Sequence, residues 1–302
     1  MKFDRDFRRH LVSRLMAVLC LGCVVIAIIP LGSILYTAAA RGIPSFSAAF
    51  FTHNLPGPCN PSFETCAAAG IWPAIEGTFI LVGLASLVAI PVGILAGIFL
   101  SQYGHLRSVR TMRFFIDVMT GIPSIVVGIF VFALFLDLSQ SGVFDVSWVL
   151  SALAGSTALI IIMLPIVART TEDSLRLVPG TLREAGLALG VRRWRVTMSV
   201  VLSTGRTAVV TGTLLAVARA AGETAPILVT TIFTQFPFTK LNAPLASIPV
   251  LIYEYGTTPY ANQISLAWGA ALFIVAIMLV ISIAARLAAG VVGTRGGLGG
   301  GG

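Results

Sequence analysis

Long apolar runs alternate with short polar segments along most of the chain. A helix needs about 20 apolar residues to cross the hydrocarbon core of a bilayer, and six runs reach that length: roughly 15–38, 73–101, 114–137, 148–168, 207–234 and 264–285. Lipid offers no partner to an unpaired backbone group, and the runs are continuous rather than alternating, so a closed β-barrel is excluded. The pattern predicts an all-α polytopic membrane protein with six transmembrane helices.

The distribution of basic residues gives the orientation of these helices. Only 11% of the 302 residues are charged, and most of the 20 Lys and Arg residues fall before the first run, between the second and third, between the fourth and fifth, and after the sixth. Positive residues concentrate in cytoplasmic loops, so both termini are expected in the cytoplasm. This topology accounts for the net charge of +8 without a nucleic-acid partner.

The runs and loops together divide the chain into segments. The triplet Ala38-Ala39-Ala40 resembles a signal-peptidase site, but the apolar run before it is too long for a typical signal peptide, so a retained helix is expected. The predicted segments are a cytoplasmic N-terminal segment at 1–14, the first transmembrane helix at 15–38, an extracytoplasmic loop at 39–72, a core with five transmembrane helices at 73–285 and a Gly-rich cytoplasmic tail at 286–302.

The cysteines and histidines give little sign of chemistry. Cys59 and Cys66 lie in the first outside loop and are expected either to form a structural disulfide or to remain free thiols. Cys20 and Cys23 lie in an apolar run and are most simply small hydrophobic residues. No metal site is predicted because the histidines stand in three separate segments, at His10, His53 and His105. No phosphate-binding G-x-x-x-x-G-K-[ST] loop occurs either, so no cofactor is expected in this chain.

Two opposite charges, Arg219 and Glu223, lie one helical turn apart inside the fifth run. A charge at the centre of a bilayer costs roughly 2.5–3.5 kcal/mol even on lenient scales. Counted from the cytoplasmic end of the run, Arg219 lies ~18 Å into the membrane at 1.5 Å per residue, near the middle of the bilayer. Pro226 is expected to kink or break the helix, with Thr224 helping to satisfy the freed carbonyl groups. The charged pair either contacts a polar substrate or only joins two helices.

The longest cytoplasmic segment follows the fourth run. Pro179 suits the start of a helix, Gly190 is placed to end it, and Ala185, Gly186 and Ala188 keep it thin enough for another backbone to approach closely. The residues alone allow two interpretations, a short interfacial helix on the lipid headgroups or a helix that docks on another protein.

The sequence Glu184-Ala185-Gly186, followed after three residues by Gly190 and later by Val200-x-Leu202, resembles the EAA loop of ABC importer permeases. In that family the loop forms a coupling helix that docks on a cytoplasmic ATPase. Gly186 stands where the family has a second Ala, and Ser203 stands where it usually has Pro. The resemblance implies coupling to an ATPase through a loop at about 179–203, by Glu184, Ala185, Gly186, Gly190 and Leu202.

Three further stretches resemble the phosphate-specific subfamily of these permeases, and its PstA-type subunits in particular: Gly121-Ile122-Pro123-Ser124-Ile125-Val126, Gly222-Glu223-Thr224-Ala225-Pro226 and Ala246-Ser247-Ile248-Pro249-Val250-Leu251-Ile252-Tyr253. The resemblance implies a type I ABC importer permease fold and a non-catalytic chain that forms half of the translocation path of an ATP-driven phosphate importer in a prokaryotic cytoplasmic (inner) membrane. Implied partners are a second homologous permease, two copies of an ATPase that uses ATP, and an extracytoplasmic phosphate-binding protein. Implied substrate-pathway residues are Arg219, Glu223, Thr224 and Arg169, although Arg169 is equally read as a positive-inside anchor.

Other functions remain open at this point. A permease for another oxyanion, such as sulfate or molybdate, would use the same residues. A passive anion channel would use an arginine-lined path without an ATPase, and the EAA-like loop argues against it. An intramembrane hydrolase fails on residues, because the chain has no G-x-S-x-G, no H-E-x-x-H and no histidine within a predicted span.

Overall fold

A computed structural model describes residues 2–59 and 69–295, which are helical with connecting loops and contain no strand. The longer helices are α1 (Lys2–Gly42), α3 (Trp72–Gln102), α4 (Arg107–Gly121), α5 (Ser124–Gln140), α6 (Ala152–Arg176), α9 (Leu202–Ala221) and α12 (Ala261–Arg295). The shorter ones are η1 (Ile43–Ser45), α2 (Ala48–Thr52), η2 (Val146–Trp148), α7 (Gly180–Ala188), α8 (Arg193–Val196), η3 (Thr197–Val201), α10 (Ala225–Thr230) and α11 (Ile248–Gly256).

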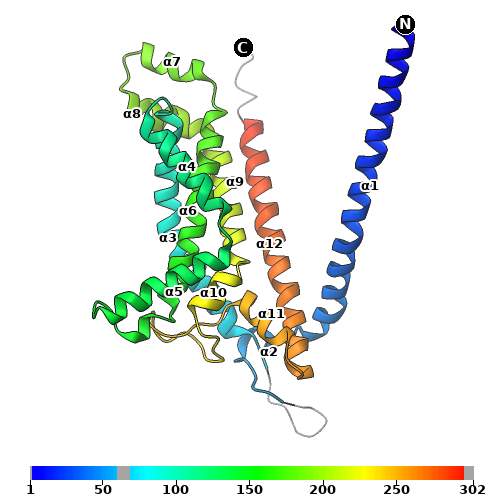
Figure 1. Ribbon diagram of the computed structural model, residues 1–302, viewed down its shortest axis with the longest axis vertical. Coiled ribbons are helices and arrows are strands. Elements are labelled where there is room, and N and C mark those ends of the chain that lie inside the picture. The colour runs from blue at the N-terminus through cyan, green and yellow to red at the C-terminus, as the bar shows by residue number, and fades with distance from the viewer. Residues whose placement is uncertain (1, 60–68, 296–302) are drawn as a thin grey trace.

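The long helices run between two ends of the molecule (Figure 1). The start of α1, the α7–α8 segment and the end of α12 lie at one end, and α2 and α11 lie at the other. Among the described residues, five helical segments are long and apolar enough to span a membrane, and the bent pair α4–α5 brings the number to six when it is taken as one span. The expected polytopic topology, with the start of α1 and the end of α12 on the same side as the α7–α8 segment, is therefore confirmed.

The third predicted span is not one continuous helix. It divides into α4 and α5, whose axes differ by 102° at a break around Ile122 and Pro123. Proline disfavours the helical conformation in the residue before it, and both Ile122 (ψ 130°) and Pro123 (ψ 132°) are extended. The sequence Gly121-Ile122-Pro123 thus ends one helix and begins another at a new angle.

The fifth predicted span is also interrupted, as Pro226 led us to expect. α9 ends at Ala221 and α10 begins at Ala225, with Pro226 in its first turn, where a missing N–H costs nothing. α10 packs on α5. The contact is close enough to require a glycine at position 128, since a Cβ atom there would lie 2.8 Å from the Cα atom of Pro226. The helices that follow the two interruptions, α5 and α10, therefore pack against each other.

The helices α3 and α6 form the centre of the bundle. Glycines on α3 allow this, since a Cβ atom on Gly97 would lie 2.6 Å from the carbonyl oxygen of Ala168. α1 is different, because its apolar side chains are exposed along most of its length and its main contact is with α12, near their shared outer end. There Arg41 lies over the Trp268 ring, 5.2 Å from its centroid.

Candidate functional site

The intramembrane charges lie where α9 ends. Arg219 is in the last turn of α9, and Glu223 lies two residues beyond the last helical residue. Their Nε and Oε1 atoms are 3.7 Å apart, and the side chain of Arg219 is 67% exposed against 15% for Glu223. The predicted pair therefore forms, but as a loose contact that leaves most of the guanidinium group free for another partner.

Arg219 and Glu223 line a cavity of about 260 Å³ at the break between α4 and α5. The other lining residues come from the end of α4, the start of α5 and the middle of α6: Met119, Thr120, Ile122, Pro123, Ser124, Val127, Ile161, Ile162 and Ile166. The first N–H groups of any α-helix lack an intrahelical acceptor. Those of Val126 and Val127 donate to the Pro123 carbonyl oxygen, which leaves the N–H group of Ser124, a residue that lines the cavity, as a donor without an intrahelical acceptor. A guanidinium group and a helix N-terminus both favour a negatively charged oxygen ligand.

The structure separates the other two predicted pathway residues from this cavity. Thr224 instead lines an apolar space of about 540 Å³ between α9, α11, α12 and the outer half of α1. Arg169 is not among the described residues that line the Arg219 cavity. Its Nε atom lies 3.4 Å from Oδ2 of Asp173.

Glu172, which sequence reasoning did not select, lies beside Arg169. Its side chain is fully buried near the cytoplasmic end of α6 and pairs with three arginines, Arg113, Arg169 and Arg176. Its spacing from Arg169 and Arg176 at i−3 and i+4 was a usable signal, whereas the approach of Arg113 from α4 was not visible in the sequence.

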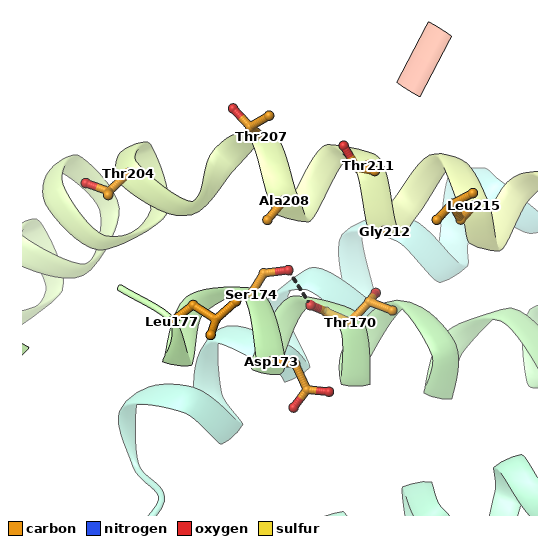
Figure 2. A pocket seen from close by; sticks show the side chains of 10 residues that line it. All are labelled: Thr170, Asp173, Ser174, Leu177, Thr204, Thr207, Ala208, Thr211, Gly212 and Leu215. Carbon is orange, nitrogen blue, oxygen red and sulfur yellow. Dashed lines mark hydrogen bonds between the residues drawn. The ribbon is translucent and has the colours of Figure 1, made fainter. Parts of the chain in front are cut away.

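A groove of about 650 Å³, whose lining residues include several with hydroxyl groups, lies between α6 and α9 toward the cytoplasmic end (Figure 2). It is lined by Thr170, Asp173, Ser174, Leu177, Thr204, Thr207, Ala208, Thr211, Gly212 and Leu215. The Ser174 side chain points toward α9, and its hydroxyl group donates to the carbonyl oxygen of Thr170 at 2.6 Å. On both helices the groove begins one turn closer to the cytoplasmic end than the Arg219 cavity. On α6, Thr170 of the groove follows Ile166 of the cavity by four residues, and on α9, Leu215 of the groove precedes Arg219 by four residues.

The predicted cytoplasmic helix is present as α7, preceded by Pro179 and ended by Gly190. Gly190 has φ +74°, its N–H donates to the oxygen of Leu187 at 2.9 Å, and the N–H of Val191 donates to the oxygen of Gly186 at 3.3 Å. This hydrogen-bond pattern is a Schellman motif, which requires a left-handed residue at the position of Gly190.

Several residues of the EAA-like loop are exposed on this segment. Leu182 and Leu189 are 42% and 83% exposed, and Glu184 and Ala185 are exposed beside them. Gly186 instead faces its own chain, because a Cβ atom there would lie 3.1 Å from Val196. Leu202 packs against the inner core cluster around Leu175 and Val201.

Two expectations concern cysteines and metals. Cys66 lies outside the described residues, so the Cys59–Cys66 disulfide stays a prediction. Cys20 and Cys23 are free thiols exposed on α1. Within the described residues, no group of His, Cys, Asp and Glu side chains is suited to hold a metal ion.

A helical membrane chain in which residues from two interrupted spans line one cavity that holds a charged pair is typical of a transporter. Residues 89–295 match the family of binding-protein-dependent transport system inner membrane components, and the chain belongs to this family. It is an integral inner-membrane permease of an ABC importer, a class that works with an ATPase and a binding protein.

The chain is similar over nearly its whole length to curated relatives. It is 37% identical over 291 residues to the phosphate transport system permease protein PstA of Haemophilus influenzae, covering 95% of this chain and 98% of the relative. It is 37% identical to PstA of Yersinia pestis, covering 92% and 90%, and 36% identical to PstA 1 of Mycobacterium tuberculosis H37Rv, covering 87% and 82%.

Its fold is similar to that of a solved type I importer. The inward-facing methionine ABC transporter MetNI aligns with a TM-score of 0.57 at 17% identity, covering 74% of this chain and 94% of the MetNI chain. The predicted type I ABC importer permease fold is confirmed.

Proposed function

We propose that the chain is the permease of an ATP-driven importer of inorganic phosphate and that the Arg219 cavity is a station for the anion. The observation that carries this proposal is the meeting of the Arg219 guanidinium group with the start of α5 in one cavity. Arg219 contributes charge and a planar fork of donors, and the α5 N-terminus contributes backbone donors and the positive end of its dipole. Together they replace part of the hydration that an anion loses on entering the membrane.

Phosphate is favoured over other oxyanions by two arguments. The relatives named above are phosphate transport permeases, and Glu223 places a carboxylate beside Arg219. A carboxylate accepts a hydrogen bond from the P–OH group of protonated phosphate, whereas fully ionised sulfate has no hydrogen to donate.

The loose contact between Arg219 and Glu223 suits transport rather than storage. When no anion is present, Glu223 offsets part of the cost of the charge on Arg219, and an arriving anion displaces it. A site on a transport path must release its ligand as readily as it takes it up, and a partner held at 3.7 Å leaves the exchange easy.

The other subunits of the proposed transporter are separate chains. The permease itself breaks no covalent bond and carries no cofactor, and ATP is used by two copies of a cytoplasmic ATPase that dock on α7. A second homologous permease completes the path, and an extracytoplasmic phosphate-binding protein delivers the anion to the outer loops.

The test is uptake of labelled phosphate and sulfate into proteoliposomes that contain this chain, its partner permease, the ATPase and the binding protein. Arg219→Gln removes the charge, and Arg206→Gln is the matched control because Arg206 is an exposed arginine on the same helix outside the cavity. Losing a charge-assisted hydrogen bond is worth about 1.5–3 kcal/mol, so Arg219→Gln is expected to lower phosphate uptake on the order of 10- to 100-fold.

The outcomes separate the parts of the proposal. Loss of phosphate uptake in Arg219→Gln alone, with the complex intact, supports both the substrate and the site. Sulfate uptake in place of phosphate overturns the substrate, and undiminished phosphate uptake in Arg219→Gln reduces the charged pair to a structural element. Uptake without the ATPase would indicate a channel.

A further inference from the structure

The carboxylate of Glu172 is the centre of an ion-pair cluster that the transport site does not include. Oε1 lies 2.6 Å from Arg113 Nε and 2.9 Å from Arg176 Nη2, and Oε2 lies 3.4 Å from Arg169 Nη1. Asp173 adds a second carboxylate through its contact with Arg169. Glu172 is fully buried and the Arg113 side chain is 23% exposed, so this pair has lost much of the screening that water gives at a surface, whereas Arg169 and Arg176 remain 40% and 46% exposed.

The cluster joins three helices at one point. Arg113 belongs to α4 and Glu172 to α6, and the second nitrogen of the same guanidinium group, Nη2, donates to the carbonyl oxygen of Leu100 near the end of α3 at 2.9 Å. Separating Arg113 from Glu172 is unfavourable because Glu172 is fully buried and Arg113 is mostly withdrawn from water, although Arg169 and Arg176 stay with Glu172. The contacts of Arg113 thus tie α4 to α6 and α3 at this point.

Both helices lead away from the cluster to functional parts of the chain. Arg176 is the last residue of α6, and only the segment 177–179 separates it from α7. Val178 in that segment is buried against Leu175 in the inner core cluster, so the link is packed rather than loose. In the other direction α4 ends beside the Arg219 cavity, whose wall includes Met119 and Thr120.

We propose that Glu172 is a positioning residue that transmits movement of α7 to α4, and through α4 to the wall of the anion cavity. The proposal rests on the proposed function, because it requires an ATPase that moves α7. A displaced α7 pulls the end of α6, the pair between Glu172 and Arg113 carries the displacement into α4, and the far end of α4 opens or closes the cavity against α5.

A simple membrane anchor would look different. Arginines that only fix the positive-inside orientation need to reach the headgroups, whereas the Arg113 side chain is just 23% exposed and satisfies two acceptors inside the protein. An anchoring role alone would affect insertion and assembly, and it would leave the amount of phosphate moved per ATP unchanged. That ratio is therefore the deciding measurement.

The experiment uses the reconstituted complex and measures phosphate uptake and ATP hydrolysis on the same proteoliposomes. The variants are Glu172→Gln, Arg113→Gln and the double substitution. Asp117→Asn is the matched control, because Asp117 is an exposed carboxylate on α4 for which the described structure shows no ion pair. Coupling free energies of 1–3 kcal/mol correspond to about 5- to 150-fold effects, so both single variants are expected to lower phosphate moved per ATP by roughly tenfold, with ATP hydrolysis and complex assembly retained.

The double variant tests whether the two residues act through each other. If they do, it is no worse than either single variant, because the second substitution removes a link that is already broken. The proposal is overturned if Glu172→Gln or Arg113→Gln moves as much phosphate per ATP as the wild type. If Glu172→Gln does not assemble, the result for Arg113→Gln decides, because Arg113 is partly exposed. If the wild-type complex takes up no phosphate, the proposed function is refuted instead. If it takes up another anion, the same variants are compared by the amount of that anion moved per ATP.

Discussion

The C-terminal cap of α7, the proposed coupling helix, gives a graded prediction at Gly190. Gly190 has φ +74°, and a Cβ atom placed there would meet no atom of the chain within 4 Å. A side chain at this position therefore meets no steric obstacle inside the permease, and its cost is the left-handed backbone alone. For an ordinary residue that cost is about 1–2 kcal/mol, and for asparagine it is smaller.

These values predict an order of affinities for the ATPase. One or two kcal/mol is a factor of roughly 5–30 in the ratio of capped to uncapped molecules, so Gly190→Ala is expected to weaken ATPase binding by up to that factor, because fewer molecules keep the capped end of α7. Gly190→Asn is expected to bind close to wild type. Gly190→Arg combines the strain of alanine with a bulky, charged side chain on the docking surface, so it is expected to bind least and to lose coupled uptake.

The assay is titration of the purified ATPase onto proteoliposomes that carry each variant at equal density, followed by phosphate uptake. If Gly190→Asn binds as poorly as Gly190→Ala, backbone conformation is not what Gly190 provides. If only Gly190→Arg is impaired, the docking surface excludes bulk and the cap is unimportant. If Gly190→Arg binds and transports normally, α7 is not the site of coupling.

Three further predictions use the same uptake assay. Glu223→Gln removes the negative charge that competes with the anion for Arg219 but keeps an amide oxygen that accepts from the P–OH group, so the anion is expected to be held longer, with the apparent KM and the maximal rate both lowered. An unchanged rate would contradict this. Gly128→Leu forces a side chain into Pro226 and is expected to reduce both thermal stability and uptake; normal melting in detergent would show that α5 and α10 can separate. Thr224→Val, in the separate apolar space, is expected to transport at the wild-type rate, and a large loss would return Thr224 to the pathway.

Features with a local cause could be predicted from the sequence. The positions of Pro179 and Gly190 define α7 because helix starts and stops depend on a few neighbouring residues. The spacing of Arg219 and Glu223 indicated a pair, although Glu223 reaches it from beyond the end of α9. Even the interruption near Pro226 followed from the chemistry of proline.

Features that depend on other helices could not be predicted. Pro123 is compatible with a kinked helix or with two separate helices, and the choice depends on contacts such as that of Gly128 with Pro226, about a hundred residues later in the chain. Glu172 has two arginines within one turn of its own helix, but the third, Arg113, comes from α4. The Arg219 cavity lies at the break between α4 and α5, so it could not be predicted without predicting that break.

The close contact between α5 and α10 has a consequence for biogenesis. α4 and α5 are synthesised well before α10, so when they enter the membrane Gly128 has no Pro226 to pack against. The side of α5 that later meets α10 waits in lipid, and the bend at Pro123 has no partner to fix its angle. The cavity is thus a late product of folding, completed only after the fifth span has inserted, and a chain stalled before residue 219 would contain the start of α5 without the arginine of the cavity wall.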